Sequence, residues 1–132
     1  MRGRCAVAGL FVAAILVAGC GAEEFPNDPR PAATVELSGK VDNRKVTVVP
    51  GRIGAGLATF TISNQTSDVV GLDFSGPNDG EIDEIPAGGI GRLQLELKTG
   101  EYTIEPSVPT IAPGTMKVGP ERPSAQNDLL LP

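Results

Sequence analysis

The 132-residue sequence contains no histidine and no tryptophan, and only 4% of its residues are aromatic. Its two cysteines, Cys5 and Cys20, both lie near the start of the chain. Without an imidazole the chain cannot build a Ser-His-Asp triad, a Cys-His pair, a histidine-containing zinc site or a blue-copper site. The Gly-x-Gly-x-x-Gly, Walker and Gly-x-Ser-x-Gly motifs are also absent from the sequence. We therefore expect a non-enzymatic protein without a cofactor.

Basic side chains are in the minority beyond the first nineteen positions. Residues 20–132 hold nine basic and sixteen acidic side chains, which gives this part a formal net charge of −7. Nucleic acid and anionic bilayer surfaces both repel such a domain at long range. The charge balance therefore argues against nucleic acid as a partner.

The first nineteen residues have the layout of a secretory signal peptide. Met1–Arg4 is short and basic, and residues 6–19 form an uninterrupted run of 14 apolar and small residues. A membrane-spanning helix needs about 20 apolar residues, so this run is too short to cross a bilayer. Arg2 and Arg4 are separated by Gly3, so the twin-arginine export signal is absent. We expect residues 1–19 to be removed after ordinary secretory export.

The apolar run closes on Val17-Ala18-Gly19-Cys20. This tetrapeptide resembles the lipobox of bacterial lipoproteins, in which small residues precede a cysteine that receives a diacylglyceryl thioether before cleavage. The resemblance implies that Cys20 is lipidated and anchors the protein to the extracytoplasmic face of the cell membrane, since two acyl chains give stable anchoring. The alternative is an ordinary signal peptide with a chance cysteine near its cleavage site.

A proline-rich tether and one domain are expected after Cys20. Residues 20–33 carry prolines at positions 26, 29 and 31, and 13 residues of extended polyproline II would span about 40 Å. From Thr34 onward, apolar residues alternate with polar ones, and turn residues recur about every ten positions. We expect a β-sandwich domain over residues 34–118 and an irregular tail over residues 119–132.

The alternation predicts seven strands, with a short eighth around Thr115–Val118. Asp42-Asn43 predicts a hairpin turn, and Thr99-Gly100 predicts another. Helical spacing is absent from the sandwich region, so the predicted fold is an all-β, antiparallel two-sheet sandwich. The apolar positions that define the strands are Val35, Leu37, Val41, Val46, Val48, Ala58, Phe60, Ile62, Val70, Leu72, Phe74, Ile82, Ile85, Leu93, Leu95, Leu97, Tyr102 and Ile104.

The order of motifs resembles the cupredoxin-like β-sandwich. An early hairpin is followed by a strand that ends in Asn64, by a Pro-Ala-Gly stretch at residues 86–88, and by Leu97-Lys98-Thr99-Gly100-Glu101-Tyr102. The resemblance covers about residues 34–118 and implies the fold. An immunoglobulin-like sandwich fits the same pattern nearly as well.

The resemblance also argues against the copper chemistry of that family. Copper-binding members carry a histidine soon after the asparagine, a cysteine shortly after the tyrosine, and a histidine and a methionine further on. The corresponding neighbourhoods here are Asp68–Val70, Glu105–Ser107 and Thr110–Met116. Only Met116 is left as a soft ligand, and a lone thioether cannot hold copper usefully.

An acidic stretch is the main candidate for cation binding. It comprises Asp73, Asp79, Glu81, Asp83 and Glu84. Carboxylates suit a hard cation such as Ca²⁺, but the spacing is not that of an EF-hand loop, and a solvated strand edge accounts for the same pattern. Glycoside hydrolysis is disfavoured, because alternation is expected to put Glu84 on the opposite face from Glu81 and Asp83.

Four further features have structural interpretations. We expect Met116 to fill a gap in the core and Tyr102 to anchor a hairpin corner through its hydroxyl. Asn64-Gln65-Thr66 matches a glycosylation acceptor, but a simple turn is the preferred interpretation. Three leucines, residues 129–131, are expected to dock on the sandwich or on a partner, the alternative being an idle tail.

Together these patterns favour a lipid-anchored extracytoplasmic envelope protein. Its sandwich would be a non-enzymatic binding or accessory module that works beside an envelope or membrane protein. The alternative function is metal handling by a degenerate cupredoxin. Fold alone does not decide between the two, because one sandwich fold hosts many functions.

Overall fold

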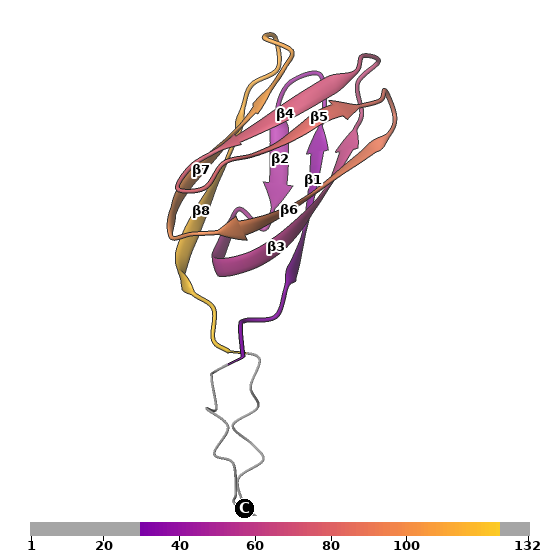
Figure 1. Ribbon diagram of the computed structural model, residues 1–132. Coiled ribbons are helices and arrows are strands. Elements are labelled where there is room, and N and C mark those ends of the chain that lie inside the picture. Colours follow the sequence, from indigo (N-terminus) through magenta and orange to yellow (C-terminus); the bar gives the residue numbers. More distant parts are fainter. Residues whose placement is uncertain (1–29, 125–132) are drawn as a thin grey trace, which may run out of the picture.

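The computed structural model describes residues 30–124, and all regular structure in this range is strand (Figure 1). The all-β fold class predicted from the sequence is therefore confirmed. Within the described range, no helix has the length and apolar character needed to cross a membrane. The strands are β1 (Val35–Val41), β2 (Val46–Val49), β3 (Arg52–Asn64), β4 (Val70–Ser75), β5 (Gly80–Ile85), β6 (Ile90–Leu97), β7 (Gly100–Pro106) and β8 (Gly114–Glu121).

The strands lie in two layers that share β3. One layer has the order β2-β1-β3-β6, and the other has the order β3-β8-β7-β4-β5. The first part of β3, Arg52–Ala55, pairs with β8, whereas its later part, from Gly56 to Ser63, pairs with β6. Gly56 has a φ of 133°, a backbone conformation that glycine adopts most readily. The chain therefore passes from one layer to the other at Gly56 without interrupting the strand.

Two of the strand pairings are parallel. β3 runs parallel to both β1 and β8, and the remaining pairings between strands are antiparallel. The sandwich is therefore mixed, where the sequence predicted purely antiparallel sheets. β2 turns the chain back along the outer side of β1, so β3 approaches the inner side of β1 in the same direction as β1 itself.

The hairpin predicted at Asp42-Asn43 is confirmed, but the one predicted at Thr99-Gly100 is wrong. β1 and β2 pair antiparallel on either side of Asp42. The strands that flank Thr99-Gly100 do not pair, because β6 pairs with β3 and β7 pairs with β4 and β8. A turn signal in the sequence shows where the chain reverses, but it does not show which strands pair with each other after the turn. The connection at Thr99-Gly100 passes between the two layers.

Tyr102 stabilises this connection. Its side chain is fully buried, and its hydroxyl accepts a hydrogen bond of 3.0 Å from the backbone N–H of Lys98. The predicted role of the hydroxyl as a corner anchor is confirmed, although the corner joins two layers and is not a hairpin.

The core lies between the inner faces of the two layers. The rings of Phe60 and Phe74 come from opposite layers and meet with their centroids 4.9 Å apart at a tilt of 59°, a geometry favoured by aromatic pairs. Met116 is 1% exposed, which confirms its predicted role as a core residue. The largest fully buried side chains are Tyr102, Phe60, Phe74, Leu37, Ile62, Leu72, Ile85, Leu97, Ile104, Met116, Val41 and Val70.

The last strand is longer than the sequence indicated. β8 continues to Glu121, whereas the irregular tail was expected to begin at residue 119. Gly119 and Pro120 obscure the alternation, but Gly119 still lies opposite Gly54, and the backbone N–H of Arg122 donates to the Ala55 carbonyl at 2.9 Å. The described part of the domain therefore extends beyond Val118.

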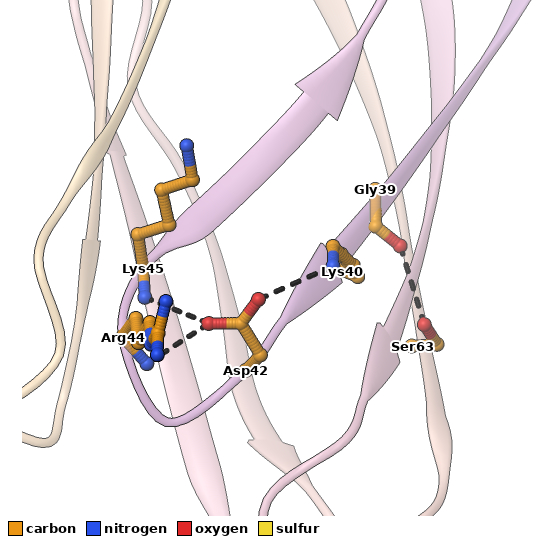
Figure 2. A network of polar contacts seen from close by, with 6 residues as sticks. All are labelled: Gly39, Lys40, Asp42, Arg44, Lys45 and Ser63. Carbon is orange, nitrogen blue, oxygen red and sulfur yellow. Dashed lines mark hydrogen bonds and ion pairs between the residues drawn. The ribbon is translucent and has the colours of Figure 1, made fainter.

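The turn between β1 and β2 is built around the Asp42 carboxylate (Figure 2). Its Oδ1 accepts hydrogen bonds from the backbone N–H groups of Arg44, at 2.9 Å, and Lys45, at 3.0 Å. Its Oδ2 lies 3.2 Å from the Lys40 ammonium nitrogen. These contacts, led by the Lys45 and Arg44 N–H groups and followed by Lys40, lower the pKa of Asp42 to about 2.

The Asp42→Asn variant is expected to flatten the acid dependence of stability. Because the folded-state pKa lies below the unfolded value, the carboxylate contributes stability fully above about pH 4, and this contribution is lost as the pH falls through about 2. Urea unfolding at a series of pH values from neutral to 2 measures the effect. Asp83→Asn, at an exposed position of β5, is the matched control. Equal acid dependence in the wild type and Asp42→Asn would contradict the prediction.

Candidate functional site

Asn64 organises the end of the sandwich where β1, β3 and β5 finish. The residue is 1% exposed, and its Nδ2 donates to the carbonyls of Asp68 at 2.7 Å, Ile85 at 2.9 Å and Pro86 at 3.2 Å. Its Oδ1 accepts from both the backbone N–H and the hydroxyl of Thr66. The turn interpretation of Asn64-Gln65-Thr66 is confirmed, and the buried amide is unavailable as a glycosylation acceptor.

The neighbourhoods that correspond to cupredoxin copper ligands are occupied by structural contacts. The backbone N–H and carbonyl of Gly71 bond to the Ser107 hydroxyl at 2.8 Å and to the Ser107 N–H at 2.9 Å, respectively. Ala112 is held to the β1–β2 turn through the Arg44 carbonyl and the Val46 N–H. The thioether of Met116 belongs to the core. Among the described residues, the groups that these neighbourhoods offer besides the Met116 thioether are carboxylate, hydroxyl and carbonyl oxygens, which do not fit copper.

Within residues 30–124, the Asp and Glu side chains form no group of three or more placed to hold a metal ion. The acidic stretch nevertheless lies partly together. Asp73 of β4 is directly opposite Glu81 of β5 on one side and Glu105 of β7 on the other. These three exposed side chains form a row across the outer face, beside a shallow hollow that Asp79 also lines. Glu105 was not among the expected acidic candidates, because it follows Asp73 by more than thirty residues.

One end of the acidic row, at Glu81, lies on a sheet edge. β5 is the last strand of its layer, and charged side chains on an edge strand discourage pairing with another chain. Like charges directly opposite each other also destabilise a sheet modestly. The arrangement can attract cationic groups in solvent, but it offers no enclosed set of ligands and no nucleophile with a base.

The expected alternation along β5 is broken by a bulge. The register shifts between Val70 and Leu72, so Ile82 and Ile85 both reach the core although they are three residues apart. Asp83 and Glu84 are therefore both exposed. The prediction that Glu84 lies on the opposite face from Glu81 and Asp83 assumed a regular strand. The bulge interrupts the regular alternation of side chains, so this reasoning does not hold for β5.

At the other end of the sandwich, Arg122 bonds to two segments that are distant in sequence, residue 33 and residues 55–57 of β3. Its Nη1 donates to the Ala33 carbonyl at 3.0 Å, its Nη2 to Leu57 at 2.6 Å and its Nε to Ala55 at 3.2 Å. The Ser124 hydroxyl also donates to the Arg30 carbonyl. We call this end, formed by residues 30–33 and 122–124, the terminal pole. Figure 1 shows that both ends of the described chain leave the sandwich there.

Sequence reasoning missed the roles of Arg122 and Asn64 for different reasons. Arg122 follows a Gly-Pro pair in a segment without alternation, so the sequence gives no signal for its partners. Asn64 did carry a signal, because a polar residue ends a strongly alternating strand and is followed two positions later by a hydroxyl side chain. That pattern indicates a side chain bonded to nearby backbone groups.

The predicted lipidation site, Cys20, and the three leucines lie outside the described residues. So do the predicted signal peptide and most of the tether. Arg30 is the first described residue, and it lies at the terminal pole. The segment that contains Cys20 therefore joins the sandwich at this end.

Comparisons with known proteins give structural neighbours only. No family model and no curated protein matches the chain. Reduced auracyanin from Roseiflexus castenholzii is similar at a TM-score of 0.48 and 12% identity, over 68% of this chain and 99% of that one. Auracyanin A from Chloroflexus aurantiacus, a "blue" copper protein, is similar at a TM-score of 0.48 and 12% identity, over 67% of this chain and 99% of that one. A multicopper oxidase is similar at a TM-score of 0.47 and 13% identity, over 74% of this chain and 46% of that one.

Two of these neighbours, auracyanin A and the multicopper oxidase, are named as copper proteins. Identities of 12 to 13% and TM-scores below 0.5 carry no inference about the activity of this chain. Its function has to be argued from its own residues.

Proposed function

We propose that the chain is a lipid-anchored protein of the extracytoplasmic face of the cell membrane. The observation that carries the proposal is the ordered Val17-Ala18-Gly19-Cys20 sequence at the end of a signal-peptide-like run. Two acyl chains on Cys20 would hold the protein on the membrane, and nine residues, 21–29, separate this anchor from the described domain.

The sandwich then acts as a non-enzymatic binding or accessory module for another envelope or membrane protein. The chain has no histidine, and both cysteines precede residue 21, so the domain lacks the usual nucleophile–base pairs. Two polar side chains with several partners, Asn64 and Arg122, donate to backbone carbonyls of the fold itself. The terminal pole leaves the two outer sheet faces and the opposite end available to a partner.

The Cys20→Ser variant is expected to accumulate as an uncleaved or wrongly cleaved precursor without lipid. Serine cannot form the thioether, and the processing of lipoprotein precursors follows lipidation. Mass spectrometry of the N-terminal peptide from the membrane fraction measures the outcome in the wild type and the variant. Cys5→Ser is the matched control, because this thiol lies just before the apolar run of residues 6–19 and its loss should leave lipidation at Cys20 unchanged.

An unmodified mature N-terminus in the wild type would overturn the proposed anchor. Crosslinking in intact membranes followed by affinity isolation tests the binding role separately. A lipidated protein that crosslinks to no envelope or membrane protein would retain the anchor but contradict the accessory role.

A further inference from the structure

Within the described residues, the edge strands of the two layers are β2, β5 and β6, and β6 is the least protected of the three. β2 has only four residues, and its Val46 N–H already donates to the Ala112 carbonyl at 3.0 Å. β5 carries a bulge and exposed acidic side chains. β6 has eight residues, contains no proline, and pairs with β3 over its whole length without a shift in register. A long, regular edge of this kind is a template for pairing with another strand.

Every second residue of β6 directs its backbone groups away from β3. The Gly89 carbonyl, one residue before β6, accepts a hydrogen bond from the last N–H of β3, whereas the Glu96 carbonyl accepts from the Asn78 side chain at 2.6 Å. Because backbone groups alternate in direction along a strand, those of Arg92 and Gln94 point outward like those of Glu96. The side chains of these three residues are exposed and make no hydrogen bond or ion pair within residues 30–124. We call the outward backbone groups of residues 92, 94 and 96 the open edge.

The side chains of the open edge are complementary to themselves. When β6 pairs antiparallel with β6 of a second copy and the pairing is centred on Gln94, each Gln94 lies opposite its counterpart and each Arg92 lies opposite Glu96 of the other copy. A shift of two residues in either direction centres the pairing on Arg92 or on Glu96 and places like charges opposite each other. Opposite charges on facing strands stabilise a sheet, and like charges destabilise it. The charges of β6 therefore select one register.

We propose that two copies of this chain pair through the open edge about a two-fold axis at Gln94. The pairing joins the β2-β1-β3-β6 layers of both copies into one continuous sheet, with a self-complementary interface of the kind that two-fold dimers use. Pairing through β5 would instead bring two acidic edges together. The Asn78 amide leaves the Glu96 carbonyl a second lone pair for the N–H of Arg92 from the other copy.

The pairing goes beyond the proposed function, because the partner is a second copy and no step of the argument uses Cys20. The interface consists of described residues of β6 alone. Its success or failure is therefore independent of the proposed lipid anchor.

Disulfide trapping at Gln94 tests the pairing, because this residue faces its own counterpart. In the Gln94→Cys variant the two Cα atoms would lie about 5.5 Å apart, which a disulfide can span. Arg92→Cys, also at an exposed position of β6, is the matched control, since its two thiols would be offset by about 14 Å along the strands. The purified full-length chain is oxidised mildly and separated by non-reducing electrophoresis, with the wild type giving the background from Cys5 and Cys20. We expect at least about tenfold more covalent dimer from Gln94→Cys than from Arg92→Cys.

Mixed variants test the register and the charges. Arg92→Cys and Glu96→Cys chains that carry tags of different size should cross-link to each other when mixed, because these positions face each other. In the Gln94→Cys background, Arg92→Glu and Glu96→Arg should each lower the dimer yield about tenfold, since each places like charges opposite, and mixing the two should restore it. Lys117→Glu, the same change of charge on the exposed face of β8, is the control and should leave the yield unchanged.

Three results would overturn the pairing. The first is an equal dimer yield from Gln94→Cys and Arg92→Cys, and the second is a higher yield from Arg92→Cys, which would mean another register. The third is a mixture of the two charge-reversed chains that does not restore the yield. Circular dichroism checks the fold of each variant, which we expect to be retained because the substituted side chains are exposed.

Discussion

The Asn64→Ala variant is expected to lose about 3 to 5 kcal/mol of unfolding free energy, because its amide serves several buried backbone groups. Its Nδ2 donates to three carbonyls and its Oδ1 accepts from two donors of Thr66. Alanine makes none of these hydrogen bonds. Because Asn64 is only 1% exposed, water cannot easily replace the amide as a hydrogen-bond partner of these groups. Urea unfolding followed by circular dichroism measures the loss.

Two further variants separate the contributions of the Asn64 amide. Asn64→Asp replaces the donating nitrogen with oxygen, so a charged oxygen would face three carbonyls, and we expect at least as large a loss as for alanine. Thr66→Val removes only the hydroxyl and should cost about 1 kcal/mol. Asn78→Ala, where a half-buried asparagine makes one bond to the Glu96 carbonyl, is the control. A loss below about 1 kcal/mol for Asn64→Ala would contradict the assigned role.

The Arg122→Ala substitution is expected to lower the free energy of unfolding by about 2 to 4 kcal/mol, because three carbonyls lose a charged donor. Arg122→Lys should recover only part of this stability, since an ammonium group cannot reproduce the planar fork that reaches Ala55 and Leu57 together. Arg92→Ala, at an exposed position of β6, is the matched control. Denaturant unfolding of each variant measures the change in unfolding free energy.

Hydrogen exchange shows where the Arg122 variant loosens. The Arg122 backbone N–H, bonded to the Ala55 carbonyl, and the amides near Gly56 should exchange faster in Arg122→Ala, while those of β4 should change least. A Cβ built at Gly56 would lie 2.7 Å from Nη2 of Arg122, so the arginine fills the space beside this crossover. Uniformly faster exchange across the domain would indicate a general loss of stability and would contradict a local role.

The strands were predictable from the sequence because burial on one face imposes alternation. Leu37 and Val41, and likewise Phe60 and Ile62, are buried as the period-2 pattern requires. The same pattern carries no information about partners. The parallel pairing of β3 with β1 and the crossing at Gly56 both depend on contacts between distant segments, which a local pattern cannot specify.

The sites were less predictable than the strands. The acidic stretch was visible as a composition bias, but the row of Asp73, Glu81 and Glu105 forms only when β5, β4 and β7 come into register. The lipobox is different in kind, because it is a linear motif whose recognition needs no fold. Cys20 was therefore accessible to sequence reasoning, whereas the carbonyl contacts of Arg122 required the assembled domain.

The adjacency of the two ends at the terminal pole has a consequence for protein engineering. Because Arg30 and Ser124 are already hydrogen-bonded to each other, a short peptide is enough to join them and close the sandwich into a ring. New ends can then be opened in the exposed turn between β4 and β5, which gives a circular permutant with the same strand contacts. For the same reason the sandwich can be inserted whole into a surface loop of a host protein, since it presents two ends with almost no separation to span.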